Sequence, residues 1–254
     1  MKLICLNIWD AKIFDPLMNF FENNQEVDIF CLQEVFNGDE PACFRGDKRI
    51  NGFQEISKRL PNHDGYFAVT EKLDEIPLKG MKIPYGLAIF VKKDIKILSH
   101  HHEIIFGKEV SVNEDGKTHK RVIQTVCVDN GGKELAISNV HGLWNGQGKT
   151  DTPDRIEQSN KIKNHISNFK HPVLLVGDFN LLPETESLAI VAKGMRDLIK
   201  ENNITSTRSS LYTKHEKPVL FADYVFASPE VEINSFKVLD DVVSDHLPLY
   251  VEIK

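Results

Sequence analysis

The sequence predicts one domain of mixed helices and strands, of the α/β or α+β class. Most of its apolar segments are four to seven residues long and rich in Ile, Val and Phe, which is typical of strands. Helical patterns lie between some of these segments along the whole chain. No Gly-, Pro- or Ser-rich linker divides the 254 residues, so we expect a single domain over residues 1–254.

Seven segments are expected to form strands. In chain order they are Lys2–Leu6, Asp28–Leu32, Leu87–Val91, Glu134–Val140, Val173–Val176, Ala222–Ala227 and Leu247–Ile253. Four long segments are expected to be loops: Phe36–Arg49, Glu71–Pro84, His100–Lys120 and Gly142–Asp151. Long loops in a compact domain usually build a binding surface, so we expect them near a functional site.

Four helices are predicted between the strands. Apolar residues at helical spacing place them near residues 14–21, 53–60, 153–169 and 187–193. Asp15-Pro16 and Thr152-Pro153 are each expected to supply an N-cap and a proline at the first helical position of a helix.

The composition limits the classes of partner. The formal net charge is −6 at pH 7 and the pI is about 5.9, which argues against binding nucleic acid through bulk positive charge. A local basic groove stays open. The acidic balance fits a site that concentrates carboxylates, as a divalent metal site must.

The cysteines and the apolar runs predict an intracellular setting. Four cysteines are too few for a disulfide framework, and Cys5 and Cys31 lie inside apolar runs that are typical of a core. No C-x-x-C pair supports a zinc or redox motif. No apolar run approaches the length of a membrane span, and the first ten residues are too short a stretch for a signal peptide. We therefore expect a cytoplasmic protein without an integral membrane segment; its oligomeric state stays open.

Polar residues recur where the predicted strands begin or end. Six strands each offer an acid, an amide or an imidazole, from the set Asn7, Glu34, His141, Asp178, Asn180, Asp223, Asp245 and His246. A hard cation such as Mg²⁺ prefers oxygen ligands, and hydrolysis of a phosphate ester needs an activated water and a stabilised leaving oxygen. Carboxylate, imidazole and amide groups supply these functions, so the set predicts one cluster.

Each residue alone also has a purely structural explanation. Glu34 could be a solvated strand end, His141 a hydrogen-bonded structural histidine, and Asn7 a turn residue. Asp223 is harder to explain in this way, because it lies within a predicted strand and a buried acid must be paired. The functional hypothesis depends on the whole set and its order.

Six short motifs carry these residues. They are Leu6-Asn7, Leu32-Gln33-Glu34-Val35, Asn139-Val140-His141, Val176-Gly177-Asp178-Phe179-Asn180, Ala222-Asp223-Tyr224-Val225 and Ser244-Asp245-His246. In this order they resemble the endonuclease/exonuclease/phosphatase superfamily, which includes deoxyribonuclease I. The resemblance implies an α+β fold, a four-layer αββα sandwich of two packed mixed sheets with helices outside. It also implies phosphoester hydrolysis with Mg²⁺ or Mn²⁺, held mainly by Glu34 with Asn7 and Asp245 close by.

The same resemblance implies roles for the other site residues. His246 acts as a general base or stabilises the transition state, and Asp223 orients it. Asp178 positions or deprotonates the attacking water, so either Asp178 or His246 takes the proton. Asn180 contacts the phosphate, and His141 binds a phosphate oxygen or assists the leaving group.

Two more substrate contacts are considered. Asn7 is expected to face the substrate as well as the metal. Trp144 could stack on a substrate or pack on the surface, in a loop that we interpret as flexible. This loop is not a P-loop, because five residues separate Gly142 from Gly148 where the Walker pattern needs four.

Two departures from the family pattern narrow the subfamily. Trp9 stands where abasic-site endonucleases usually carry Asp, and His141 stands where they tend to use Tyr. Both argue against an abasic-site endonuclease, and the choice of His over Tyr looks more like deoxyribonuclease I, sphingomyelinases and phosphoinositide phosphatases. An acidic partner for His141 is expected from the first half of the chain, with Glu71 and Glu75 as candidates.

Two polar segments are interpreted as solvated loops. The histidine run at residues 100–102 could bind a transition metal, but three consecutive side chains cannot all face one ion on a strand. Arg45, Lys48 and Arg49 follow Glu34 and could meet substrate phosphates or simply face solvent.

Three functional hypotheses follow. The first is a metal-dependent phosphodiesterase or nuclease in which water attacks the phosphate in line. The second is a phosphomonoesterase or a phospholipid hydrolase of the inositol phosphate or sphingomyelin type. The third is a binding module that keeps the sandwich without catalysis. The expected partner is a phosphoester substrate, and nucleic acid is one form of it.

Overall fold

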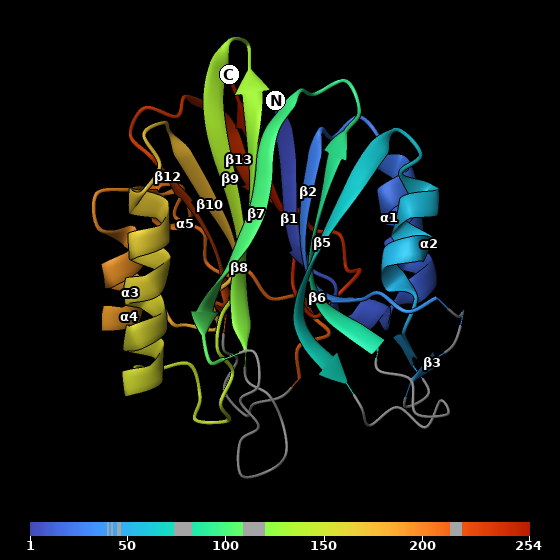
Figure 1. Cartoon of the computed structure of the whole chain (residues 1–254). Helices are drawn as coiled ribbons and strands as arrows, with labels where there is room; N and C mark the ends of the chain where they lie inside the picture. Colours follow the sequence, from blue (N-terminus) through green and yellow to red (C-terminus); the bar gives the residue numbers. More distant parts are fainter. Residues whose placement is uncertain (40, 42, 45–46, 74–82, 109–119, 214–219) are drawn as a thin grey trace.

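Two six-stranded sheets pack face to face, and helices cover the outer face of each sheet (Figure 1). The computed structural model describes residues 1–39, 41, 43–44, 47–73, 83–108, 120–213 and 220–254. The layers follow the order helix, sheet, sheet, helix, so the expected four-layer α+β sandwich is confirmed.

The first sheet holds the two ends of the chain. Its strands are β1 (Lys2–Asn7), β2 (Ile29–Phe36), β5 (His63–Leu73), β6 (Ile83–Lys92), β13 (Ile233–Val238) and β14 (Leu249–Ile253). They lie in the order β13-β14-β1-β2-β6-β5. The first strand, β1, pairs parallel with β2 and antiparallel with the last strand, β14.

The second sheet is built from the middle of the chain. Its strands are β7 (Ile97–Phe106), β8 (Arg121–Asn130), β9 (Lys133–His141), β10 (Val173–Asp178), β11 (Arg196–Asp197) and β12 (Asp223–Ala227). They lie in the order β11-β12-β10-β9-β8-β7, with β9 and β10 parallel. A small ribbon of β3 (Cys43–Phe44) and β4 (Lys48–Arg49) lies apart.

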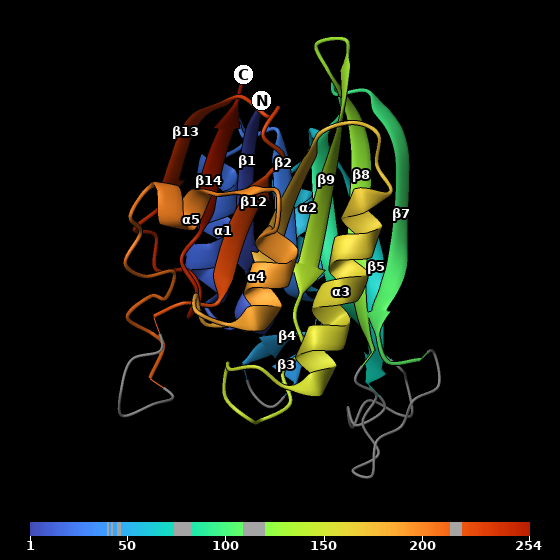
Figure 2. The ribbon, with the colours of Figure 1, turned by 90° about the vertical axis from the view of Figure 1, so that its left-hand side faces the viewer.

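The helices divide between the two outer faces. They are a 3₁₀ turn η1 (Trp9–Ala11), α1 (Phe14–Asn23), α2 (Gly52–Arg59), α3 (Pro153–Ser167), α4 (Glu186–Ala192) and α5 (Leu198–Glu201). Figures 1 and 2 show α1 and α2 over the first sheet, with α3 and α4 over the second. Thr152 caps α3 as predicted, accepting from Arg155 N at 3.3 Å. The predicted Asp15 cap is wrong: α1 starts at Phe14 and Asp15 lies in its first turn.

Two apolar cores hold the layers together. The larger lies between the sheets and includes Leu3 and Ile89 from the first sheet with Val126 from the second. The smaller lies between the first sheet and its helices, where Phe21 of α1 meets Phe30 of β2 with ring centroids 5.4 Å apart. Each such fully buried side chain contributes about 1.5–3 kcal/mol to folding.

Three of the expected loops contain strand residues instead. The loop expected at Glu71–Pro84 overlaps the end of β5 and the start of β6, and residues 74–82 are outside the described part of the chain. The histidine run at residues 100–102 lies in β7, whose middle is exposed, so the predicted loop His100–Lys120 is wrong as far as Phe106. This strand lies at the edge of its sheet and carries polar side chains, so it lacks an apolar pattern. Residues 109–119 are outside the described part of the chain. The expected loop Phe36–Arg49 contains the β3–β4 ribbon, whereas Gly142–Asp151 holds no strand or helix, as predicted.

The described helices are all too short or too polar to traverse a lipid bilayer.

Candidate active site

The polar ends of four strands meet at one edge of the two sheets. In each sheet two parallel neighbours, β1 with β2 and β9 with β10, end on the same side. Asn7 closes β1, and its Nδ2 donates to Glu34 Oε1 at 3.1 Å and to Asp178 Oδ2 at 3.0 Å. Because Glu34 belongs to the first sheet and Asp178 to the second, one amide joins both sheets at this edge.

Glu34 departs from the regular path of β2. The pairing of β2 with β6 shifts between Leu32 and Val35, and Glu34 has a φ of 58°. This left-handed conformation is strained for a residue that carries a Cβ, at a cost of about 1–3 kcal/mol. A bulge of this kind redirects a side chain, and here the carboxylate reaches Asn7.

Asp178 is fixed by close packing of the main chain where β9 and β10 end. Its Oδ1 accepts a hydrogen bond from Asn180 N at 2.8 Å, and its carbonyl oxygen accepts one from Gly142 N at 2.6 Å. A Cβ on Gly142 would lie 2.1 Å from Phe179 O, so only glycine fits where the chain leaves β9. This close approach brings His141, Asp178 and Asn180 together, with Asn180 Nδ2 donating to Gly142 O at 3.4 Å.

His246 is oriented by Asp223 at the start of β12. Its Nδ1 lies 2.8 and 2.9 Å from the two carboxylate oxygens of Asp223, and Thr207 Oγ1 donates to Asp223 Oδ2 at 2.9 Å. An ionised carboxylate can only accept, so Nδ1 carries the proton and Nε2 presents its lone pair. This Nε2 lies 3.5 Å from Asp178 Oδ2, inside the cluster.

A buried arginine that the sequence did not single out stands beside His246. Arg208 Nη1 donates to Asp245 Oδ2 at 3.2 Å and to His246 Nε2 at 2.5 Å. Its guanidinium also lies 4.1 Å from the ring centroid of Tyr212. Arg208 comes from a polar segment without apolar periodicity, so no local sequence pattern indicated that it would be buried.

A buried lysine also enters the cluster from the loop after β9. Lys149 is only 4% exposed, and its Nζ has no hydrogen-bond partner among the described residues. Burial lowers the pKa of this ammonium to about 8, although the carboxylates of Asp178, Asp223 and Asp245 act to raise it. The positive charge of Arg208 also acts to lower it.

The charges around Asp178 keep it ionised. Burial acts to raise the pKa of its carboxyl, but the neighbouring His246 and Lys149 outweigh burial and hold the pKa well below its usual range. Asp178 therefore stays an anion at neutral pH. A carboxylate with such a low pKa is a poor acceptor for a proton from water.

Asp10 is a second acid beside Glu34 that the sequence did not assign to the site. Burial and the neighbouring Glu34 carboxylate together raise the pKa of its carboxyl to about 6, although an ion pair with Lys48 acts to lower it. Lys48 therefore pairs with an acid in this structure. Arg49 packs over the Phe14 ring, at 4.1 Å from its centroid. Arg45, the third basic residue considered above, lies outside the described residues.

The donor set fits a hard divalent cation. Ligand atoms of Glu34, His141 and Asp178 lie within 4.8 Å of one another. Asn7 faces both acids with its Nδ2, whereas its Oδ1, the atom that could bind a cation, accepts from Trp9 N at 3.0 Å. Carboxylate and amide oxygens are the ligands that Mg²⁺ and Mn²⁺ prefer. Asp245, the third expected ligand, lies on the His246 side: its Oδ2 accepts from Arg208, and its buried Oδ1 has no hydrogen-bond partner in the described chain.

The remaining predicted substrate contacts are Trp144 and His141. Trp144 is 39% exposed, in the loop that also carries Lys149. His141 Nε2 lies 3.7 Å from Glu34 Oε1 and 3.9 Å from Asp178 Oδ2. The acidic partner expected for His141 is not tested, because Glu75 and the side chain of Glu71 are outside the described part.

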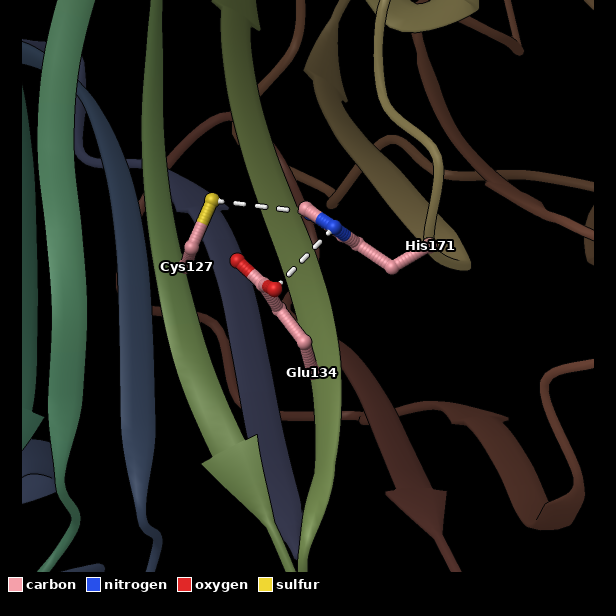
Figure 3. Close-up of side chains that lie close together, drawn as sticks. All are labelled: Cys127, Glu134 and His171. Atoms are coloured by element: carbon pink, nitrogen blue, oxygen red, sulfur yellow. Dashed lines mark hydrogen bonds and ion pairs between the residues drawn. The ribbon is translucent and has the colours of Figure 1, made fainter.

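A separate group of metal-type side chains lies at the opposite end of β9 and β10 (Figure 3). Cys127 Sγ lies 3.7 Å from His171 Nε2, and His171 Nδ1 lies 3.4 Å from Glu134 Oε2. Burial raises the pKa of the Cys127 thiol, and the Glu134 charge raises it too. A metal needs the thiolate, so this group is poorly prepared to bind one.

Comparison with known proteins agrees with the fold. A sequence model described as "Endonuclease/Exonuclease/phosphatase family" matches residues 13–246. No curated protein sequence matches the chain. Among solved structures, a mannosyl-6-phosphatase of Bacteroides thetaiotaomicron VPI-5482 is similar, with a TM-score of 0.74 and 18% identity over 100% of this chain and 99% of that one.

Two further solved structures share the architecture. A humanised D. rerio TDP2 has a TM-score of 0.67 and 16% identity, over 100% of this chain and 98% of that one. The catalytic domain of human Nocturnin with a bound sulfate anion has a TM-score of 0.65 and 18% identity, over 100% and 94%. At these identities the likeness establishes the shared fold.

Proposed function

Because the chain belongs to the endonuclease/exonuclease/phosphatase family, we propose that its strand-end cluster hydrolyses phosphate esters with a divalent cation, Mg²⁺ or Mn²⁺. One observation carries this proposal. Asn7, Glu34, Asp178 and His246 come from distant parts of the chain, and contacts of 3.1, 3.0 and 3.5 Å link Glu34 to Asn7, Asn7 to Asp178 and Asp178 to His246. Such a cluster contains oxygen ligands for a cation and an oriented imidazole. Phosphoester hydrolysis needs both, one to bind the metal and the other to accept a proton.

The cation would be held by the first-sheet side of the cluster. Glu34 would be the principal ligand, and the Asn7 amide oxygen and Asp245 are the other two predicted ligands. When bound, the ion would polarise the phosphoryl group and stabilise negative charge on the leaving oxygen.

The protein's own residues handle the attacking water. Asp223 holds the Nδ1 proton of His246, so Nε2 can accept a proton when water adds to phosphorus and the bond to the leaving oxygen breaks. Asp178 stays ionised, so it accepts a hydrogen bond from the water and stabilises the imidazolium that forms, 3.5 Å away. Of the two bases left open by the sequence, we therefore assign proton transfer to His246.

The phosphate and its leaving group would meet the second-sheet side. Asn180 projects from the end of β10 and is expected to donate to a phosphate oxygen. His141 lies near Asp178 at the end of β9 and is expected to bind the phosphate or protonate the leaving oxygen. Trp144, exposed in the next loop, is placed to contact the group attached to the phosphate.

There are two candidate classes of substrate. A phosphodiester, including nucleic acid, is the first expectation from the sequence. A phosphomonoester is the second, and the buried cations Lys149 and Arg208 favour it. One structural neighbour is a mannosyl-6-phosphatase, which supports the same candidate. A cytoplasmic location and a single-domain organisation stay predictions.

Hydrolysis of bis(p-nitrophenyl) phosphate and of p-nitrophenyl phosphate tests the proposal. We expect turnover of at least one ester with Mg²⁺ or Mn²⁺, none with EDTA, and recovery when metal is restored. Glu34→Gln should raise the Mg²⁺ concentration for half-maximal rate about tenfold or more, because it removes the charged ligand. Glu134→Gln, at the other end of the second sheet, is the matched control. Metal-independent hydrolysis, or no turnover of any ester in a panel with DNA, RNA, inositol phosphates and sphingomyelin, would contradict the proposal and favour a binding module.

A further inference from the structure

Lys149 is a buried charge whose hydrogen bonds are not made within the described chain. An ammonium group can donate three hydrogen bonds, and removing it from water without such partners is costly. The charges that act on its pKa are those of three carboxylates of the site and of the Arg208 guanidinium. A group with this much unused donor capacity, inside a cluster of catalytic type, is suited to a ligand that brings acceptor oxygens.

The main chain on both sides of Lys149 is held in place. Arg155 of α3 is 1% exposed, and its guanidinium donates to the carbonyl oxygens of Gly148 and Thr150, the two neighbours of Lys149. Lys149 O itself accepts from Leu182 N at 2.9 Å. The loop was interpreted from the sequence as flexible, but these bonds fix the backbone from which the lysine enters the site.

Asp151, two residues after Lys149, ties the same segment to α4. Asp151 accepts from the main-chain nitrogens of Glu186 and Ser187, each at 2.8 Å. Lys149 is therefore presented from a segment bonded to α3, α4 and the chain after β10. The side chain of an ordinary surface lysine, in contrast, extends freely into solvent.

Arg208 is a second buried cation, and its charge acts on Lys149. Its Nη1 is engaged by Asp245 and His246, whereas its Nε is buried with no hydrogen-bond partner in the described residues. Two cations buried near each other repel, and an anion between them removes that cost. A phosphate oxygen that drew Arg208 toward itself would also release the lone pair of His246 Nε2.

We propose that Lys149 and Arg208 bind the non-bridging oxygens of a phosphomonoester dianion, so that the site prefers monoesters to diesters. This inference rests on the proposed function for the site. A monoester phosphate carries up to two negative charges on three free oxygens, whereas a diester carries one charge on two. Two cations of the protein, in addition to the metal, match the more highly charged ester.

The test compares two esters in the full-length protein. Values of kcat/KM for p-nitrophenyl phosphate and bis(p-nitrophenyl) phosphate are measured with Mg²⁺ for the wild type, Lys149→Met, Lys149→Arg and Lys161→Met. Lys149→Met should lower monoester hydrolysis about 100-fold and diester hydrolysis about tenfold or less, because one charged donor is lost from the more anionic reaction. Lys149→Arg should recover part of the monoester rate. Lys161, which pairs with Glu157 on the exposed face of α3, is the control and should change neither rate.

A binding measurement separates this inference from the proposed function. Calorimetric titration with inorganic phosphate at pH 7.5 should give a Kd about tenfold weaker for Lys149→Met than for the wild type and Lys161→Met. Circular dichroism checks that each variant is folded, and Lys149→Arg replaces Lys149→Met if the latter is not. If the wild type hydrolyses neither ester, the proposed function fails while the titration still tests phosphate binding. Equal losses for both esters, or unchanged phosphate affinity, would overturn the inference.

Discussion

The opposite ends of β9 and β10 carry the same kinds of side chain in two different settings. At the carboxyl ends, His141 and Asp178 are buried and meet Asn7 and Glu34 from the other sheet. At the amino ends, Glu134 is 43% exposed, and the group of Cys127, Glu134 and His171 comes from the neighbouring strands β8 and β9 and from the loop before β10. Residue type alone therefore does not distinguish a site from a surface cluster.

Convergence and burial are what differ between the two ends. At the carboxyl ends, charges from both sheets act through a medium that screens poorly, so the pKa of Asp178 falls in spite of its burial. At the amino ends, water and salt screen the half-exposed Glu134–His171 pair, whose interaction is weak. The pKa values of a polar cluster are shifted strongly when the cluster is buried between separate layers of the fold.

The largest expected effect comes from removing one imidazole at each end. His246→Ala should lower kcat about 1,000-fold or more, because it removes the group assigned to accept the proton from water. His171→Ala should leave kcat within about twofold, since exposed pairs contribute little. Steady-state rates and circular dichroism of both variants check this. Comparable rates for the two variants would show that the two ends do not differ in function.

A smaller effect is expected from a methyl group at each end of β9. Gly142→Ala places a Cβ 2.1 Å from Phe179 O and should cost about 3 kcal/mol of stability together with most of the activity, because the backbone must move. Gly131→Ala, in the turn before β9, meets no atom within 4 Å and has a φ of 63°, so it should cost only about 1 kcal/mol. Urea unfolding of both variants measures the difference. Equal costs would mean that the close approach at Gly142 is not tight.

The smallest expected effect is a pH dependence confined to the buried end. Burial lowers the pKa of Lys149 to about 8 from its ordinary 10.5, so the charged form costs stability below pH 8 and the cost is relieved as pH rises toward 10.5. Lys149→Met should therefore be more stable than the wild type at pH 7, by on the order of 2 kcal/mol. The difference should shrink between pH 8 and 10.

Chemical unfolding at several pH values tests this dependence. Lys161→Met, which alters an exposed pair, should show no such trend. A constant difference between Lys149→Met and the wild type across this range would mean that Lys149 is not a buried charge in solution.

Parts of the fold that depend on local pattern could be predicted from the sequence. Short apolar runs located β1 and β10, and Thr152-Pro153 located the start of α3, because runs and caps are recorded in neighbouring residues. The edge strands β5, β7, β11 and β13 and the inner strand β8 were not predicted. In β7 most side chains face water, so no apolar period distinguishes the strand from a loop.

The candidate site divides in a similar way. Asn7, Glu34, Asp178 and His246 could be assembled from the sequence because each stands at a strand end, in an order typical of one family. Lys149 and Arg208 could not, because most lysines and arginines in loops are solvated. Their burial results from loops packing over the strand ends, which depends on the whole tertiary structure.

The hydrogen bond from Ser244 Oγ to Asn7 O, at 2.6 Å, joins a residue near the start of the chain to one near its end. Asn7 emerges from the ribosome 237 residues before Ser244, and His246 follows two residues later. A nascent polypeptide that ends before Ser244 therefore carries Asn7 and Glu34 without His246, to which the proposed mechanism assigns proton transfer. Under the proposed function, the candidate site is complete only after translation has passed His246.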